Sequence, residues 1–284
     1  MQKKYISKSV YNVAAALLLV LFLMPEFCEF GQDKGETSPR IVMLGDSALG
    51  ECRDETSVSA QLSALLGEDV FNGALGGTTM SHIAANNSLA RVNDCMSMAS
   101  LSRSIVSDDF GPQQAARIRE SMTYYFEDTI NEMEQIDFAS VDILLIAHGV
   151  NDYHAGVPIA NEENPYDTYT YTGTIRSAVE LLRQRYPDMR IILMTPTYTW
   201  YPYHTSPRLT CEEYNLGGGV LEEYVNAEIE LAEDLGVEVI DNYHELYPHE
   251  AWSDWELSTN DGLHPNERGR QLIAQKIADY LEKH

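Results

Sequence analysis

The sequence predicts a three-layer α/β/α fold, in which helices cover both faces of a parallel β-sheet. Short apolar runs rich in β-branched residues alternate along the chain with longer segments that carry apolar residues at helical spacing. This alternation is typical of βαβ units, and near-continuous apolar runs indicate strands buried on both faces. The 284 residues are enough for one well-packed core, and no repeat divides the chain into comparable halves.

Five strands and five helices are expected in alternation. The predicted strands are Ile41–Leu44, Asp69–Asn72, Val141–Ala147, Met189–Thr195 and Val237–Asp241. The predicted helices are Ser57–Leu66, Pro112–Gln135, Thr174–Tyr186, Val220–Leu235 and Asn266–Glu282. Two segments, Ser81–Gly111 and Pro196–Gly219, fit neither pattern and are expected to be long loops. Loops of this length are usually functional or disordered, and the aromatic content of the second favours order.

Residues 1–30 have the pattern of an export signal. Lys3, Lys4 and Lys8 precede the apolar run Val13–Met24, which is short for a membrane span and long enough for the central region of a signal peptide. No small-x-small cleavage site follows, so an uncleaved anchor is the alternative. We therefore expect a signal peptide or signal anchor over residues 1–30, a single domain over residues 38–284, and a secreted or cell-envelope location.

Charge and cysteine content limit the partners and the cross-links. The formal net charge of −25 repels phosphate backbones and anionic lipid, so nucleic acid is not expected as a partner, and a membrane is expected only through an uncleaved anchor. Cys28 lies at the edge of the export segment, whereas Cys52, Cys95 and Cys211 are far apart. One disulfide plus one free thiol, or reduced buried thiols, fit this spacing, which matches no zinc motif.

The first chemical motif, Gly45-Asp46-Ser47, directly follows the first predicted strand. The glycine permits a tight turn into a helix, and Ser47 then lies near a helix start. Asp46 is expected to bond within the loop. Alone, this pattern is more often a turn with a capping serine, so its meaning depends on the motifs further along the chain.

Two further motifs offer N–H donors at strand ends, where sites form in open parallel sheets. The segment Asn72–Thr79 contains three glycines, and its Gly77 is a candidate backbone donor to an oxyanion. Asn151, after the most apolar strand, is a candidate side-chain donor. Each motif alone would be read as an ordinary turn. His148, Asp152 and His154 could suggest a metal site, but their spacing matches no metal motif, so none is expected.

The fourth motif is Asp261-Gly262-Leu263-His264-Pro265, just before the last predicted helix. An acid three residues before a histidine in a turn can accept one imidazole N–H, fix the tautomer and leave the other nitrogen for Ser47. The alternative is a helix cap with a surface histidine. A serine with a base and an orienting acid is an activated nucleophile, which predicts a hydrolase.

Together the four motifs resemble those of the SGNH branch of the GDSL esterase/lipase family, named for a serine, a glycine, an asparagine and a histidine in that order. By position, the resemblance implies Ser47 as the nucleophile, Gly77 and Asn151 as oxyanion donors, His264 as the base and Asp261 as the acid of the triad. It also implies a carboxylic ester hydrolase with no cofactor and no metal.

The resemblance further implies a bacterial, exported protein whose SGNH hydrolase domain has a flavodoxin-like, five-stranded parallel sheet of order 2-1-3-4-5. It covers residues 41–84, 141–153 and 237–282. Many relatives have aspartate at the position of Thr78, so hydrogen bonding around that loop can differ. The chain lacks the Gly-x-Ser-x-Gly elbow, which argues against the larger α/β-hydrolase fold.

The substrate is expected to be an acetyl or other short acyl ester of a carbohydrate. Aromatic rings with polar tips suit sugar rings, and a cleft is expected to be walled by Tyr198, Trp200, Tyr201 and Tyr203, with Tyr166, Tyr169 and Tyr171. These rings could equally pack the long loops onto the sheet. The alternatives are an acyltransferase to a sugar hydroxyl and a lipase- or lysophospholipase-type esterase. A non-catalytic binding module is a disfavoured alternative, because binding alone requires none of the triad residues. A metal-dependent phosphodiesterase is less favoured still.

Overall fold

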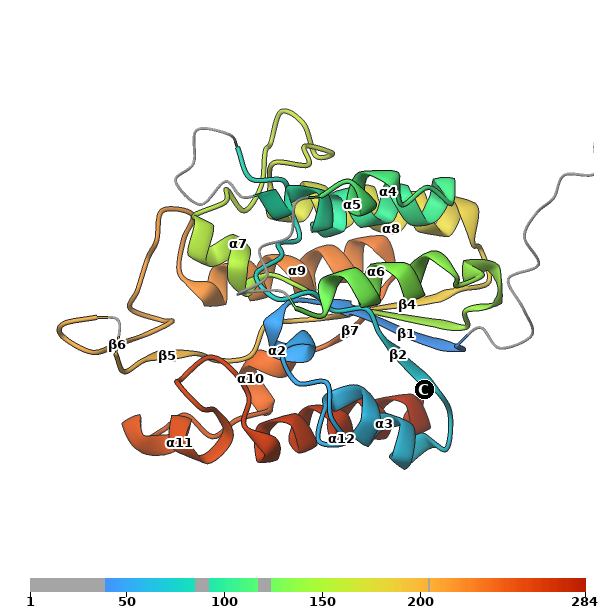
Figure 1. The fold of residues 1–284 in the computed structure, drawn as a ribbon. Helices are drawn as coiled ribbons and strands as arrows, with labels where there is room; N and C mark the ends of the chain where they lie inside the picture. Colours follow the sequence, from blue (N-terminus) through green and yellow to red (C-terminus); the bar gives the residue numbers. More distant parts are fainter. Residues whose placement is uncertain (1–38, 85–91, 117–123, 204) are drawn as a thin grey trace, which may run out of the picture. The chain divides into compact units, whose positions relative to one another are not determined.

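A five-stranded parallel sheet organises the chain in the computed structural model, which describes residues 39–84, 92–116, 124–203 and 205–284 (Figure 1). Its strands are β1 (Ile41–Gly45), β2 (Val70–Asn72), β3 (Ile143–Ala147), β4 (Arg190–Met194) and β7 (Glu238–Ile240), in the order β2-β1-β3-β4-β7. Because β7 is the fifth strand of this sheet along the chain, the predicted order 2-1-3-4-5 is confirmed. The predicted export segment, residues 1–30, lies outside the described residues.

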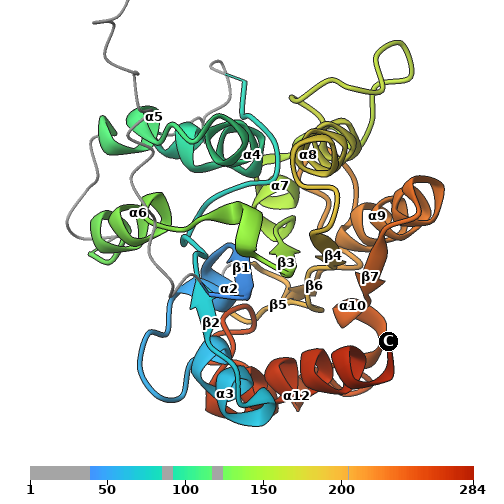
Figure 2. The same cartoon turned by 90° about the vertical axis from the view of Figure 1, so that its right-hand side faces the viewer.

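Helices cover both faces of the sheet, which confirms the three-layer fold (Figure 2). One face carries α3 (Val58–Leu66) and α12 (Glu267–Lys283), which pack on each other. The other carries α4 (Met98–Ser107), α6 (Phe126–Glu134), α8 (Tyr171–Arg185) and α9 (Leu221–Leu235). Short helices complete the connections: α2 (Ser47–Gly50), α5 (Gly111–Gln114), α7 (Val150–Ala155), α10 (Asn242–Glu245), α11 (Trp255–Ser258), and the 3₁₀ turns η1 (Val92–Met96), η2 (Phe138–Ser140) and η3 (Trp252–Asp254).

Capping side chains set where the two helices on the α3 face begin. Ser57 accepts a hydrogen bond from the Ala60 N–H at the start of α3, and Asn266 accepts one from the Gly269 N–H at the start of α12. Each bond satisfies a donor that the first helical turn leaves without a partner. The predicted helices began at the capping residues themselves, so both bounds were one residue early.

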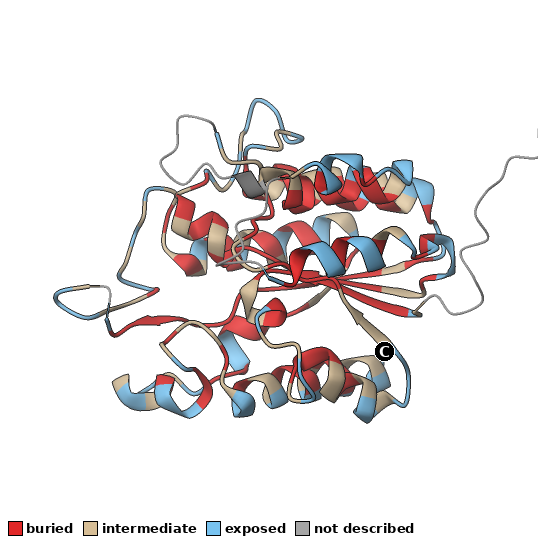
Figure 3. Cartoon of the chain, in the orientation of Figure 1, coloured by how far each residue is buried: buried red, intermediate tan, exposed pale blue. Residues whose placement is uncertain are grey.

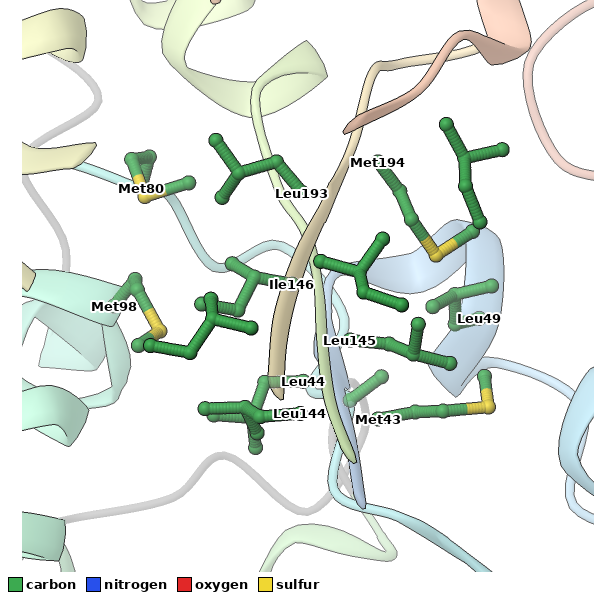
Figure 4. Packing of buried hydrophobic residues seen from close by; sticks show 14 of the residues in the cluster. Met43, Leu44, Leu49, Met80, Met98, Leu144, Leu145, Ile146, Leu193 and Met194 are labelled. Atoms are coloured by element: carbon green, nitrogen blue, oxygen red, sulfur yellow. The ribbon is translucent and has the colours of Figure 1, made fainter. Parts of the chain in front are cut away.

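The core consists of two apolar layers, one on each side of the sheet. Strand β1 is buried along its whole length, and the buried residues concentrate where the helices face the strands (Figure 3). Successive strand residues point to opposite faces. Leu44 therefore points toward Met98 of α4, whereas Met43 points toward the side of Leu49 of α2 (Figure 4). Each fully buried side chain of this kind contributes roughly 1.5–3 kcal/mol.

Two predictions on the α4 side of the sheet are wrong. The segment Ser81–Gly111 contains the ten-residue helix α4, whose serines hide a buried stripe at Met98, Leu101 and Ile105 that packs toward α8. The predicted helix Pro112–Gln135 is not continuous, because α5 ends at Gln114 and α6 begins only at Phe126. Burial against neighbouring elements overrides the weak helix propensity of serine in the first case.

The described residues of the segment 196–219 include a two-stranded antiparallel hairpin, β5 (Trp200–Tyr201) with β6 (Leu209–Thr210). No disulfide joins any two of the described cysteines, which are Cys52, Cys95 and Cys211. Within the described ranges, no helix combines the length and the apolar character that crossing a membrane needs.

Candidate active site

Ser47 lies where β1 turns directly into α2. Asp46 caps this short helix by accepting a hydrogen bond from the Ala48 N–H at 3.0 Å. Gly45 is needed for the close approach of β1 and β3, since a Cβ there would lie 2.8 Å from the Ala147 carbonyl oxygen. The turn therefore presents Ser47 at the carboxyl edge of the sheet, as its position after the strand predicts.

His264 and Asp261 complete a continuous hydrogen-bonded chain with Ser47. The Nε2 atom of His264 lies 3.1 Å from Ser47 Oγ, and its Nδ1 lies 2.8 Å from Asp261 Oδ2. A carboxylate on Nδ1 fixes the tautomer in which Nε2 is free to accept the serine proton. The structure thus brings together three residues that lie up to 217 positions apart in the sequence.

The Asp261 carboxyl is held in its charged form. Its partial burial acts to raise the pKa, but hydrogen bonds from the His264 ring and from the backbone N–H groups of His264 and Leu263 outweigh this, so the pKa lies below its ordinary value. A carboxylate that accepts several N–H bonds is stabilised in this way. The charge opposite Nδ1 is therefore present across the neutral pH range.

The turn that carries Asp261 and His264 is supported by the β5–β6 hairpin. Gly262 adopts φ +91°, and its carbonyl oxygen accepts the Trp200 N–H at 2.8 Å. A Cβ at this position would lie 2.4 Å from the Trp200 carbonyl oxygen, so only glycine fits. Thr259 Oγ1 also accepts the Gly262 N–H at 2.9 Å. These contacts fix the direction in which the imidazole points.

A glycine loop and an asparagine lie beside the serine. A Cβ on Gly76 would lie 3.6 Å from Ser47 Cβ, which places this loop against Ser47. Gly77 has φ +74°, and no hydrogen bond from its N–H is found among the described residues. Asn151, in the first turn of α7, donates from Nδ2 to the Thr78 carbonyl oxygen at 2.9 Å. The two predicted oxyanion donors therefore belong to one bonded unit next to Ser47.

Buried side chains hold this unit in place. Asp152 accepts the N–H groups of Met80 and Ser81 at 2.7 and 2.9 Å, and burial raises its pKa to about 6. The Thr78 hydroxyl, which stands where many relatives have aspartate, donates to the Leu75 carbonyl oxygen at 2.6 Å. Burial likewise raises the pKa of Asp46 to about 7, against the lowering effects of the Ala48 N–H and of nearby His264.

The histidines near Asn151 do not gather around a common point. His148 is fully buried, burial lowers its pKa to about 3, and neither ring nitrogen has a hydrogen-bond partner in the described part of the structure. The Nε2 atom of His154 instead lies 2.8 Å from the Tyr201 hydroxyl. In the ranges that the structure describes, no three His, Cys, Asp or Glu side chains are placed to hold a metal ion.

Two hollows adjoin the Ser47–His264 pair. The first, which we term the open cleft, has a volume of about 580 Å³ and is lined among others by Ser47, Glu51, Arg53, Tyr124, His264 and Arg270. The second, termed the inner cavity, has a volume of only about 30 Å³ and is lined among others by Ser47, His148, Met194, Asn242, Leu263 and His264. The serine therefore lies between a spacious polar side and a confined side.

The predicted aromatic cleft wall is largely wrong. Tyr198, Trp200 and Tyr201 are at most 5% exposed, because they pack the 196–219 segment onto the core, and Tyr198 stacks on His249 at 4.3 Å. Tyr203 is exposed but packs edge-on against Trp255. The remaining candidates also include both exposed and buried rings: Tyr166 and Tyr169 are exposed, whereas Tyr171 is buried.

Several residues at the site were not predicted from the sequence. Tyr124, 74% exposed, lines the open cleft, and the adjacent Tyr125 accepts the Gly76 N–H at 2.9 Å. Both tyrosines are far from Ser47 and His264 in the sequence, and no local sequence pattern predicts that either of them lies at the site. Glu51 Oε2 lies 3.9 Å from His264 Nε2. Its spacing of four residues from Ser47, one helical turn, is a signal that could have found it.

Comparison with known proteins agrees with this geometry. The profile of the GDSL-like Lipase/Acylhydrolase family matches residues 43–272, most of the chain. The human protein named isoamyl acetate-hydrolyzing esterase 1 homolog is 26% identical over 152 residues. That match covers 51% of this chain and 58% of the human protein, so the chain spans little more than half the length of this curated relative.

Solved structures share the fold at low sequence identity. A protein from Lactobacillus plantarum superposes with a TM-score of 0.63 at 18% identity, over 88% of this chain and 99% of that one. A possible lipase from Chitinophaga pinensis gives a TM-score of 0.54 at 19% identity, over 85% and 97% of the two chains. The fold, the arrangement around Ser47 and the extent of the profile match agree, and the chain belongs to the GDSL-like lipase/acylhydrolase family.

Proposed function

We propose that this protein is a serine hydrolase that cleaves carboxylic esters through an acyl-enzyme intermediate. The observation that carries the proposal is the chain of hydrogen bonds from Asp261 through His264 to Ser47, at 2.8 and 3.1 Å. A serine hydroxyl is a weak nucleophile until a base accepts its proton, and this arrangement supplies that base in the required tautomer. A binding module does not require such a chain of hydrogen bonds.

In the proposed acylation step, His264 Nε2 accepts the Ser47 proton while Oγ bonds to the ester carbonyl carbon. The carbonyl oxygen becomes an oxyanion, which accepts hydrogen bonds from the N–H groups of Ser47 and Gly77 and from the Asn151 amide. Each such donor contributes about 10²–10³ in rate. The intermediate then collapses, the bond to the alcohol oxygen breaks, and the proton on His264 passes to the leaving alcohol. Water later releases the acid by the same steps in reverse order.

We infer that the substrate carries a short acyl group, such as acetyl, on a carbohydrate. The inner cavity of about 30 Å³ favours a small group on one side of Ser47, and the open cleft of about 580 Å³ favours a bulky polar group on the other. The exposed ring of Tyr124 in that cleft can stack on a sugar. This assignment of Tyr124 replaces the one based on Tyr198, Trp200 and Tyr201.

The substrate proposal is tested with a panel of acetylated oligosaccharides and simple acyl esters of increasing chain length. Acetyl esters are expected to have the highest kcat/KM among the simple esters, and acetylated oligosaccharides to exceed them. A lipase-type esterase would instead prefer long acyl chains. That result would overturn the carbohydrate proposal and leave the ester hydrolase proposal intact.

The nucleophile is tested with the variant Ser47→Ala. We expect loss of turnover of 4-nitrophenyl acetate with an unchanged circular dichroism spectrum, because the alanine removes only one oxygen at a turn held by Asp46 and Gly45. Ser107→Ala, an exposed serine at the end of α4, is the matched control and should keep full activity. Activity retained by the Ser47 variant would contradict the proposal.

We also propose that the protein is exported, through the signal peptide or anchor expected over residues 1–30. Expression of the full chain in a bacterial host, followed by fractionation and N-terminal analysis of the mature protein, tests this. Recovery from the periplasm or medium with a new N-terminus would support a cleaved signal. An intact N-terminus in the membrane fraction would support the anchor, and an intact chain in the cytoplasm would refute export.

A further inference from the structure

A second carboxylate lies beside the reacting nitrogen of the histidine. Glu51 Oε2 is 3.9 Å from His264 Nε2, the atom that also faces Ser47 Oγ at 3.1 Å. Glu51 directly follows α2, and its N–H donates to the Ser47 carbonyl oxygen at 3.1 Å. The position of this residue is therefore tied to that of the nucleophile. Its side chain is 63% exposed and reaches into the open cleft.

Apart from Asp261 and His264, the other charged side chains that line the cleft form their hydrogen bonds away from Ser47. Arg53 donates to the carbonyl oxygens of Gly50, Asn72 and Ala74. Arg270 donates to Thr56 and Pro265, and Asp54 accepts from Thr56 and Cys52. Among the described residues, the Glu51 carboxylate has His264 as its one ionic neighbour. Besides Asp261 and His264, Glu51 is therefore the charged residue of the cleft that lies closest to the reacting nitrogen.

The spacing of these two acceptors suits a single water molecule. Two hydrogen bonds of about 2.8 Å that diverge from one water oxygen bridge acceptors roughly 4.4 Å apart, and slight bending of the bonds accommodates the 3.9 Å between these two atoms. We propose that Glu51 positions the hydrolytic water on His264 Nε2 once Ser47 is acylated, and so directs the acyl-enzyme toward hydrolysis. The inference rests on the proposed function, because it concerns the second half of that reaction.

In the proposed deacylation step, the two O–H groups of the water have different partners. One water O–H bonds to Glu51 Oε2, and the other gives its proton to His264 Nε2 while the water oxygen bonds to the acyl carbonyl carbon. The tetrahedral intermediate collapses with breakage of the bond to Ser47 Oγ. The proton on His264 then passes to Oγ, which restores the serine and releases the carboxylic acid. Glu51 accepts a hydrogen bond throughout and takes no proton, so it acts as a positioning residue.

Glu51 thereby separates two outcomes that share the same acyl-enzyme. A sugar hydroxyl has only one proton to donate, so it cannot bond to Nε2 and Glu51 at once through that oxygen, whereas water can. The carboxylate therefore favours water over an alcohol as the acceptor of the acyl group. Loss of the carboxylate should slow hydrolysis and raise the share of transfer to an added alcohol.

The test uses Glu51→Gln in the full chain with 4-nitrophenyl acetate, whose leaving group needs no proton. Its kcat/KM reports acylation, and its kcat reports deacylation when that step is slower. We expect kcat/KM to change less than about 2-fold and kcat to fall about 10- to 100-fold, the effect of one hydrogen bond to a charged group. Acetylated protein should accumulate on acid quenching and be visible by intact mass spectrometry.

A matched control and a second measurement complete the test. Glu55→Gln removes the same charge from a nearby exposed residue outside the cleft lining, and should leave both constants unchanged. With glycerol as an added acceptor, the ratio of acetylated glycerol to free acetate should rise about 10-fold or more in the Glu51 variant.

The outcomes distinguish this inference from the proposed function. An active wild-type protein with unchanged kcat and unchanged product ratio in Glu51→Gln overturns the role of Glu51 alone. Equal loss in kcat and kcat/KM also overturns it, since Glu51 would then support His264 in both steps. A wild-type protein that neither turns over esters nor becomes acetylated refutes the proposed function, and the inference with it.

Discussion

The variant Glu228→Gln is expected to make the protein more stable, by an amount that grows with pH. Glu228 lies on α9, is fully buried, and accepts the Tyr171 hydroxyl on Oε2 at 2.6 Å, while Oε1 has no partner in the described part of the structure. Burial raises its pKa from 4.5 to about 8; the bond from Tyr171 opposes this, and the charge of Asp152 adds to it.

The sign and size follow from proton binding. Between pH 4.5 and about 8 the unfolded chain has released the Glu228 proton while the folded protein still holds it. The unfolded state then binds fewer protons, so stability falls as pH rises through this window, by up to about 1.4 kcal/mol per pH unit. The stability that the wild type loses in this way between pH 4.5 and pH 7 is roughly 3 kcal/mol. Above pH 8 the loss levels off at about 5 kcal/mol. Glutamine does not titrate and resembles the protonated acid in shape.

Urea unfolding at pH 5, 6, 7 and 8 measures this difference. The free energy of unfolding of Glu228→Gln minus that of the wild type should be near zero at about pH 4.5 and rise steadily toward pH 8. Glu230→Gln, an exposed glutamate on the same helix, is the control and should show no such rise. A difference that is constant with pH would refute the reasoning, because it would mean that the Glu228 pKa is not raised in the folded state.

Two further predictions concern the site itself. Asn151→Ala should lower kcat on acetyl esters about 10²–10³-fold with little change in KM, because an oxyanion donor acts mainly in the transition state; an unchanged kcat would remove Asn151 from the oxyanion site. Gly262→Ala should lower both the melting temperature and kcat, since its Cβ would lie 2.4 Å from the Trp200 carbonyl oxygen at φ +91°. Thermal unfolding and a kinetic assay check it, with Gly67→Ala, a positive-φ glycine with open space around it, to separate backbone strain from the clash.

The sequence predicted the parts of the fold that depend on local pattern and on the geometry of parallel sheets. Ser47 and Asn151 follow β1 and β3, and neighbouring parallel strands end at one edge, so their proximity could be expected before any coordinates. Asp261 and His264 lie three residues apart in one turn, which makes their bond a local property.

Features that depend on tertiary packing were beyond that reach. Helix α4 forms because its apolar stripe at Met98, Leu101 and Ile105 is buried. The helix that helps to cover this stripe, α8, is distant in the sequence, so the residues of the segment do not predict the contact. The aromatic content of residues 196–219 favours an ordered segment, but it does not predict which of the rings are buried and which are exposed. Tyr124 reaches the cleft from a region with no motif of its own.

The bonds between the β5–β6 hairpin and Gly262 have a consequence for attempts to change what this protein acts on. Long insertions after strands are the usual place to redesign specificity, because scaffold and chemistry do not depend on them. Here Trp200 holds the turn that aims His264, so grafting a new segment over residues 196–219 would displace the base together with any altered contact. Libraries of variants for new substrates are better placed at Tyr124. This residue lines the open cleft but lies outside residues 196–219, so its side chain can change while the turn that carries His264 keeps its support.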